Sequence, residues 1–123
     1  MVNTVDWIEI RTGDIEKTAE FYEEVFGWEV VRKETADGSE YWIFDTCAEP
    51  RMENIRRGAI WQRPTEPPRI VVYIVVEDIE EVLGKVKEKG GRVVTPKKQE
   101  GSFYKAYFAD PGGNMVGLWE EQE

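Results

Sequence analysis

Two stretches of the chain carry the same amphipathic pattern, and their first residues, Asp14 and Asp78, are 64 positions apart. In the first stretch the apolar positions recur with the period of an α-helix. The residues on that face are Ile15, Thr18, Ala19, Tyr22 and Phe26. This pattern predicts a helix that begins after an Asp14 N-cap and ends before Gly27, a residue suited to a left-handed C-terminal position.

The second stretch predicts a helix over residues 79–89, and short alternating or β-branched segments surround both helices. We expect strands at residues 4–11, 28–33, 41–45 and 58–63, and again at 70–76, 92–95, 103–109 and 115–120. Turns are predicted at 37–38, 97–101 and 110–114. The chain is therefore predicted to be one α+β domain of residues 1–123, built of two βαβββ modules, 1–64 and 65–123.

Composition excludes several classes of function. The formal net charge is −9, which argues against binding nucleic acid or an anionic membrane surface. The sequence contains no histidine, so histidine-based catalytic triads and the HExxH zinc site are excluded. Cys47 is the single cysteine, which fits a reducing cytoplasm, and no apolar run is long enough to span a membrane.

The repeat resembles the vicinal oxygen chelate superfamily of glyoxalases, bleomycin-resistance proteins and extradiol dioxygenases. The resemblance is carried by the segments 14–28 and 78–91 and by the Asp110-Pro111-Gly112-Gly113-Asn114 turn. It is closest to an uncharacterised glyoxalase-like group. It implies a curved mixed sheet around a central cavity, small-molecule binding and a homodimer.

The resemblance also implies where a metal would be bound in members that use one. The equivalent positions here are Trp7, Ala59, Val71 and Gly117. None of these side chains can ligate a divalent cation. We therefore expect no metal and no cofactor.

Strand alternation identifies further residues on the side that the family curves inward. Trp7 is on the same side of its strand as Glu9, and Val71 is on the same side as Tyr73. In the last strand of each module, Ala59 is on the same side as Trp61, and Gly117 is on the same side as Trp119. These residues predict a site for a flat or apolar ligand, with Arg63 as a candidate contact for an anionic group. The alternative is that the aromatic side chains only fill the interior.

Glu9 is the candidate for catalysis. Desolvation among aromatic groups would favour its neutral form and suit it to act as a general base. The sequence leaves three hypotheses open: a metal-independent binding protein for an apolar or aromatic compound, a metal-independent lyase or isomerase that uses Glu9, and a scaffold with a filled core.

Overall fold

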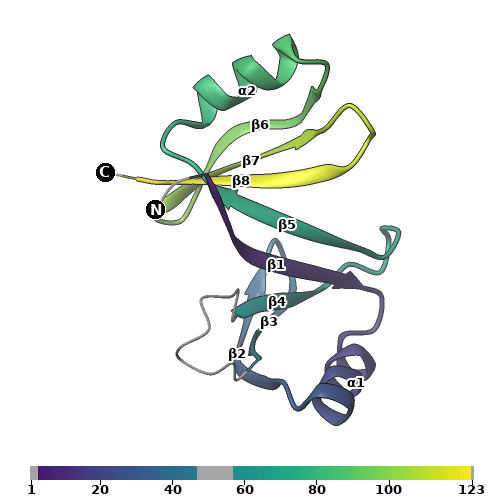
Figure 1. The fold of residues 1–123 in the computed structure, drawn as a ribbon. Coiled ribbons are helices and arrows are strands. Elements are labelled where there is room, and N and C mark those ends of the chain that lie inside the picture. The colour runs from purple at the N-terminus through teal and green to yellow at the C-terminus, as the bar shows by residue number, and fades with distance from the viewer. Residues whose placement is uncertain (1–2, 47–56, 123) are drawn as a thin grey trace. The chain divides into compact units, whose positions relative to one another are not determined.

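The computed structural model describes residues 3–46 and 57–122, so Cys47 lies outside the described residues. The elements are β1 (Thr4–Thr12), α1 (Ile15–Phe26), β2 (Glu29–Ala36), β3 (Ser39–Asp45), β4 (Arg57–Gln62), β5 (Arg69–Val75), α2 (Ile79–Glu88), β6 (Arg92–Glu100), β7 (Phe103–Ala109) and β8 (Met115–Glu121) (Figure 1). The predicted order βαβββ followed by βαβββ, and with it the α+β class, is confirmed, whereas the module bounds 1–64 and 65–123 stay a prediction. No helix of the described residues is long and apolar enough to cross a membrane.

The described residues form two compact units. Residues 7–70 make up the first, which we call the α1 unit, and residues 71–122 with residues 3–6 make up the second, the α2 unit. The strand order is β2-β3-β4-β1 in the α1 unit and β5-β8-β7-β6 in the α2 unit. In each unit the strand before the helix pairs in parallel with the last strand, and the other pairs are antiparallel. The two units therefore repeat one topology.

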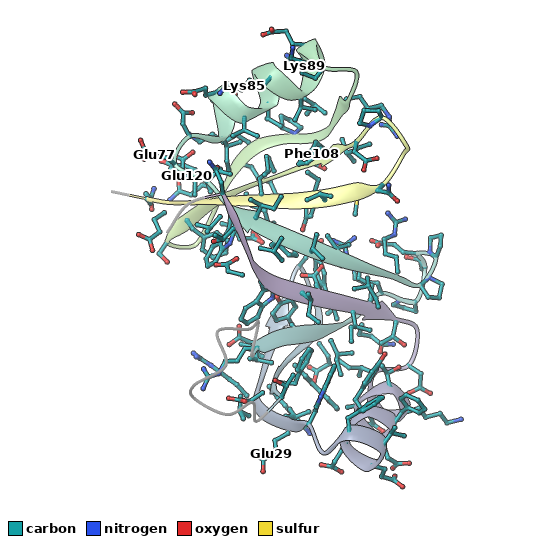
Figure 2. The ribbon with its side chains drawn as sticks, viewed as in Figure 1. Glu29, Glu77, Lys85, Lys89, Phe108 and Glu120 are labelled. Atoms are coloured by element: carbon teal, nitrogen blue, oxygen red, sulfur yellow. The ribbon has the colours of Figure 1, made fainter. Side chains whose placement is uncertain are left out.

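Each unit has its own apolar core beneath its helix. In the α1 unit the core consists of Ile10, Ile15, Ala19, Trp42, Phe44 and Ile60. In the α2 unit it consists of Val76, Ile79, Leu83, Ala106 and Leu118. Phe108 packs against the second core, whereas Lys85 and Lys89 lie on the outer side of α2 (Figure 2). Burial of these apolar side chains is what holds each amphipathic helix to its strands.

The two helices begin in the same way. The side chains of Asp14 and Asp78 accept hydrogen bonds from the backbone N–H groups of Lys17 and Glu81, as the predicted N-caps require. A second contact was not foreseen from the sequence. The N–H of Ile15, at the start of α1, donates to Gln62 Oε1 at 2.7 Å.

The same contact recurs in the α2 unit, where the N–H of Ile79 donates to Glu120 Oε1 at 2.8 Å. Glu120 lies beside the start of α2 in Figure 2. Gln62 and Glu120 are each near the end of the last strand of their unit, so in both units a long-range hydrogen bond joins that strand to the helix.

Two local predictions were wrong. Phe26 was expected on the buried face of α1, but it is 61% exposed because it lies in the last turn, where its ring contacts Tyr22 and Trp28 at the edge of the core. The segment 97–101 was expected to be a turn, but β6 continues to Glu100 and the chain reverses at residues 101–102. Register shifts between Val93 and Lys98 let the strand continue through Pro96.

The turn between β7 and β8 is organised by one carboxylate. Asp110 Oδ1 accepts hydrogen bonds from the N–H groups of Gly112 and Asn114, and Asn114 Nδ2 donates to both carboxylate oxygens. The side chain of Asn114, followed by its backbone N–H, holds the pKa of Asp110 below its usual value because these donors favour the charged carboxylate.

The Gln62 contact generates a stability prediction. Gln62→Ala removes both the acceptor for the Ile15 N–H and the hydrogen bond that Gln62 Nε2 donates to the carbonyl of Gly13, and it should lower the free energy of unfolding by about 0.5–2 kcal/mol. Urea denaturation measures this loss. Gln99→Ala is the matched control, because its exposed amide makes only long contacts of 3.5 Å. An equal loss in both variants would contradict the role of Gln62.

The Asp110 turn generates a pH prediction. A folded-state pKa below the unfolded value stabilises the fold above that unfolded value, and the stabilisation is lost as the pH falls through the folded pKa. Asp110→Asn should therefore lower the melting temperature at pH 7, and the difference from the unmodified protein should close as the solution is acidified. Glu20→Gln, on the exposed side of α1, makes the same change in net charge and is the matched control for the melting temperature at pH 7. A difference that persists unchanged into acid would refute this prediction.

Candidate functional site

The candidate site in the α1 unit lies on the strand face opposite α1. Ile10 and Ile60 point into the core, so their neighbours along β1 and β4 point the other way. The residues on this opposite face include Trp7, Glu9, Arg11, Ala59 and Trp61. Tyr41 of β3 joins them, because it is directly paired with Trp61. Trp7, Glu9 and Trp61, all predicted from the sequence, therefore lie on one face.

Aromatic side chains form a connected row on this face. The indole N–H of Trp7 donates to the hydroxyl oxygen of Tyr41 at 3.1 Å. The ring of Tyr41 meets the ring of Trp61 edge-on, with 5.7 Å between their centroids. Trp61 is only 5% exposed and donates its own indole N–H to the carbonyl of Ala36. Trp61 is therefore a buried support of the row, whereas Trp7 is only half-buried.

A buried ion pair lies on the same face. Glu9 and Arg11 are 2% and 7% exposed, and Arg11 Nε donates to Glu9 Oε1 at 2.9 Å. Glu9 is predicted from the sequence to lie among aromatic rings, and the structure adds a guanidinium partner from the same strand. Both groups are largely removed from water, so the charge of each is stabilised by its partners and not by solvent.

The ion pair continues into a chain of charges across the ring of Trp61. Arg11 Nη1 also donates to Glu66 Oε1 at 3.2 Å, and Arg63 Nε donates to Glu66 Oε2 at 3.1 Å. Arg63 Nη2 reaches Asp37 at 3.3 Å. The guanidinium carbons of Arg11 and Arg63 lie 5.0 and 3.9 Å from the centroid of the Trp61 ring, within the range of cation–π attraction.

The equivalent face of the α2 unit has a different character. Tyr73 and Gly117 are paired across β5 and β8, and Gly117 is also paired with Tyr107 on β7. The hydroxyl groups of Tyr73 and Tyr107 share a hydrogen bond of 2.5 Å. Trp119 lies on this face as well, where its indole N–H donates to Asp6 and its ring meets Phe103 edge-on. The tyrosine pair replaces the ion pair of the α1 unit.

The metal-equivalent positions do not fit a metal. Ala59 and Val71 are fully buried hydrocarbon side chains, and the indole of Trp7 is a hydrogen-bond donor without a lone pair to offer. The space over Gly117 is occupied by the ring of Tyr73, since a Cβ at Gly117 would collide with that ring. These positions supply no donor set for the divalent cation that the family resemblance implies.

Sequence reasoning missed four residues of these faces. Arg11 could have been found, because it shares the alternation of Trp7 and Glu9 on β1. Tyr41, Glu66 and Tyr107 had no comparable signal. They reach the faces through strand register and turn geometry that link positions 34 to 55 residues apart.

Comparison with known proteins is consistent with the fold described above. The family model of the Glyoxalase/Bleomycin resistance protein/Dioxygenase superfamily matches residues 4–118. The chain therefore belongs to this superfamily.

Individual relatives are distant. The chain is 28% identical over 118 residues to "Putative glyoxylase CFP32" of Mycobacterium tuberculosis, a match that covers 95% of this chain and 45% of that protein. It is 28% identical over 126 residues to the anthracycline biosynthesis protein DnrV of Streptomyces peucetius, with 94% and 46% covered. The chain thus spans less than half the length of these two relatives.

Among solved structures, a Streptomyces coelicolor methylmalonyl-CoA epimerase has a similar fold. The TM-score is 0.71 at 16% identity, with 98% of this chain and 96% of that chain covered. At this identity the likeness extends to the fold alone.

The contact between Tyr73 and Gly117 generates a stability prediction. Gly117→Ala forces the ring of Tyr73 to move and should lower the free energy of unfolding by about 1–3 kcal/mol, as overpacking does. Gly84→Ala is the matched control, because a Cβ at this helical glycine meets no atom within 4 Å. The control should gain about 0.5–1 kcal/mol from improved helix propensity. Urea denaturation that shows no loss for Gly117→Ala would refute the close packing.

Proposed function

We propose that this protein binds a small planar aromatic molecule on the strand face opposite α1, without a metal ion. The observation that carries the proposal is the half-buried indole of Trp7, fixed by Tyr41 on a face that also holds the buried Glu9–Arg11 pair. A rigid, partly accessible ring beside oriented polar groups is the usual composition of a small-molecule site. The name of one relative, an anthracycline biosynthesis protein, supports a flat aromatic ligand.

The α2 unit, taken by itself, has a comparable ring in Trp119, which is also only partly buried on the strand face of that unit and is a separate candidate for a ligand contact. Trp61 and Tyr73, both 5% exposed, are better suited to supporting the binding surfaces than to covering a ligand. Binding without a metal is supported by the side chains at the metal-equivalent positions, which lack ligating atoms. A homodimer and a cytoplasmic location stay predictions.

A second candidate function is favoured by the burial of Glu9. A carboxylate held at 2.9 Å from a guanidinium on an aromatic face is well oriented to accept a proton from a bound molecule, so Glu9 would be the general base of a metal-independent lyase or isomerase. Glu9→Gln distinguishes the two functions. The amide retains an oxygen to accept from Arg11, so a binding protein keeps its affinity for neutral ligands, whereas an enzyme keeps binding and loses turnover.

Tryptophan fluorescence provides the main test. Neutral planar aromatic compounds should quench the emission, and Trp7→Ala should weaken binding about tenfold or more through lost contact area and stacking. Phe21→Ala is the matched control, because this aromatic side chain is 55% exposed on α1, away from the proposed face. Equal affinity of both variants would argue against Trp7 as a ligand contact, and the absence of quenching across a broad panel would favour a filled scaffold.

The same preparation tests independence from metal. A ligand that binds only the native state must raise the melting temperature. The planar ligand should do so in the presence of a chelator, whereas zinc, nickel or manganese alone should not. Ligand binding that a chelator abolishes would refute this part of the proposal.

A further inference from the structure

Glu66 holds an unusual position between two arginines. Its two carboxylate oxygens are divided between them, with Oε1 accepting from Arg11 Nη1 at 3.2 Å and Oε2 from Arg63 Nε at 3.1 Å. Both guanidinium groups lie against the ring of Trp61. A carboxylate held by two guanidinium groups beside an aromatic ring is the arrangement in which a protein recognises a free carboxylate ligand.

Among the described residues, Glu9, Glu66 and Asp37 are acidic residues that these arginines contact, and they differ in how firmly they are held. Glu9 is on a central strand and its side chain is 3% exposed, so it cannot leave the pair without disturbing the sheet. The side chain of Glu66 is 31% exposed, ten times as much. Asp37 is 73% exposed and contacts only the outer side of the network, at Arg63. Glu66 is therefore the partner that both contacts the buried arginine and is open to solvent.

The backbone around Glu66 allows its side chain to move alone. Glu66 follows the end of β4, and its N–H donates to the carbonyl of Arg63 at 3.3 Å within a short turn. Pro64, Pro67 and Pro68 surround it and restrict the backbone. Rotation about the side-chain bonds of Glu66 is enough to take its carboxylate into water, while the arginines stay fixed on Trp61.

The exchange replaces one carboxylate with another. When the Glu66 side chain rotates away, the ligand carboxylate takes its place and accepts from the same two donors, Arg11 Nη1 and Arg63 Nε.

We propose that Glu66 is a displaceable internal carboxylate that occupies the anion-binding part of the ligand site, and that the ligand is a planar aromatic molecule bearing a carboxylate. The aromatic part rests on the proposed function, and the carboxylate part rests on the arginine pair. The ligand carboxylate takes the place of Glu66 between Arg11 and Arg63, and its ring lies on the face that includes Trp7.

The experiment compares benzoate with benzamide, which has the same shape without the charge. Removing the internal competitor in Glu66→Gln should raise the affinity for benzoate about tenfold, the effect of one charge-assisted contact, and leave that for benzamide unchanged. Glu20→Gln is the matched control for the change in net charge. If benzamide binds and benzoate gains nothing in Glu66→Gln, the proposal is overturned and Glu66 is a structural ion-pair partner.

A second measurement needs no aromatic binding. Glu66→Ala removes the carboxylate that lies between Arg11 and Arg63, so acetate can bind there in its place. Acetate should therefore raise the melting temperature of this variant relative to chloride at equal ionic strength. The unmodified protein and Glu20→Ala should not respond. Failure of acetate to stabilise Glu66→Ala overturns the proposal. If acetate stabilises it but neither aromatic probe binds any variant, the arginine pair does hold a carboxylate, and it is the proposed aromatic binding that fails.

Discussion

The hydrogen bond between the last strand and the first turn of the helix is the constraint on which each unit depends. Gln62 accepts from Ile15 in one unit and Glu120 accepts from Ile79 in the other, at nearly the same distance. Because the acceptor is on a strand and the donor on a helix, the bond fixes where each helix starts on its sheet. The helix then covers one strand face with its apolar side and leaves the opposite face available for polar and aromatic chemistry.

The two opposite faces have diverged while the framework has stayed the same. In the α1 unit that face holds an ion pair and a chain of charges on Trp61. In the α2 unit a tyrosine pair covers the glycine that a metal-binding relative would replace with a ligand. A side chain that opposes the core takes no part in holding the helix, so it is constrained by the packing of its own face and not by the helix. Repetition of the fold therefore does not imply repetition of the chemistry.

The helices, their Asp14 and Asp78 caps and the positions of the strands along the chain could be predicted, because local patterns in the sequence determine them. The inward-facing strand residues Trp7 and Glu9 followed from alternation. The partners of the site could not be predicted, because Arg11 meets Glu66 across 55 positions and Trp7 meets Tyr41 across 34. Residue type did not predict which aromatic side chains are accessible to a ligand. Trp61 was predicted to line the ligand site, but it is buried and its ring contacts two guanidinium groups.

The opening residues of β1 have a consequence for how the polypeptide is made. The N–H of Asn3 donates to the carbonyl of Val75, and Asp6 accepts from the indole of Trp119, so residues that precede the α1 unit in the sequence complete the α2 unit that follows it. During translation the α1 unit has all of its residues once residue 70 has left the ribosome. The α2 unit must wait for β8, and a deletion that removes residues 3–6 would disturb the α2 unit and not only the strand that it shortens.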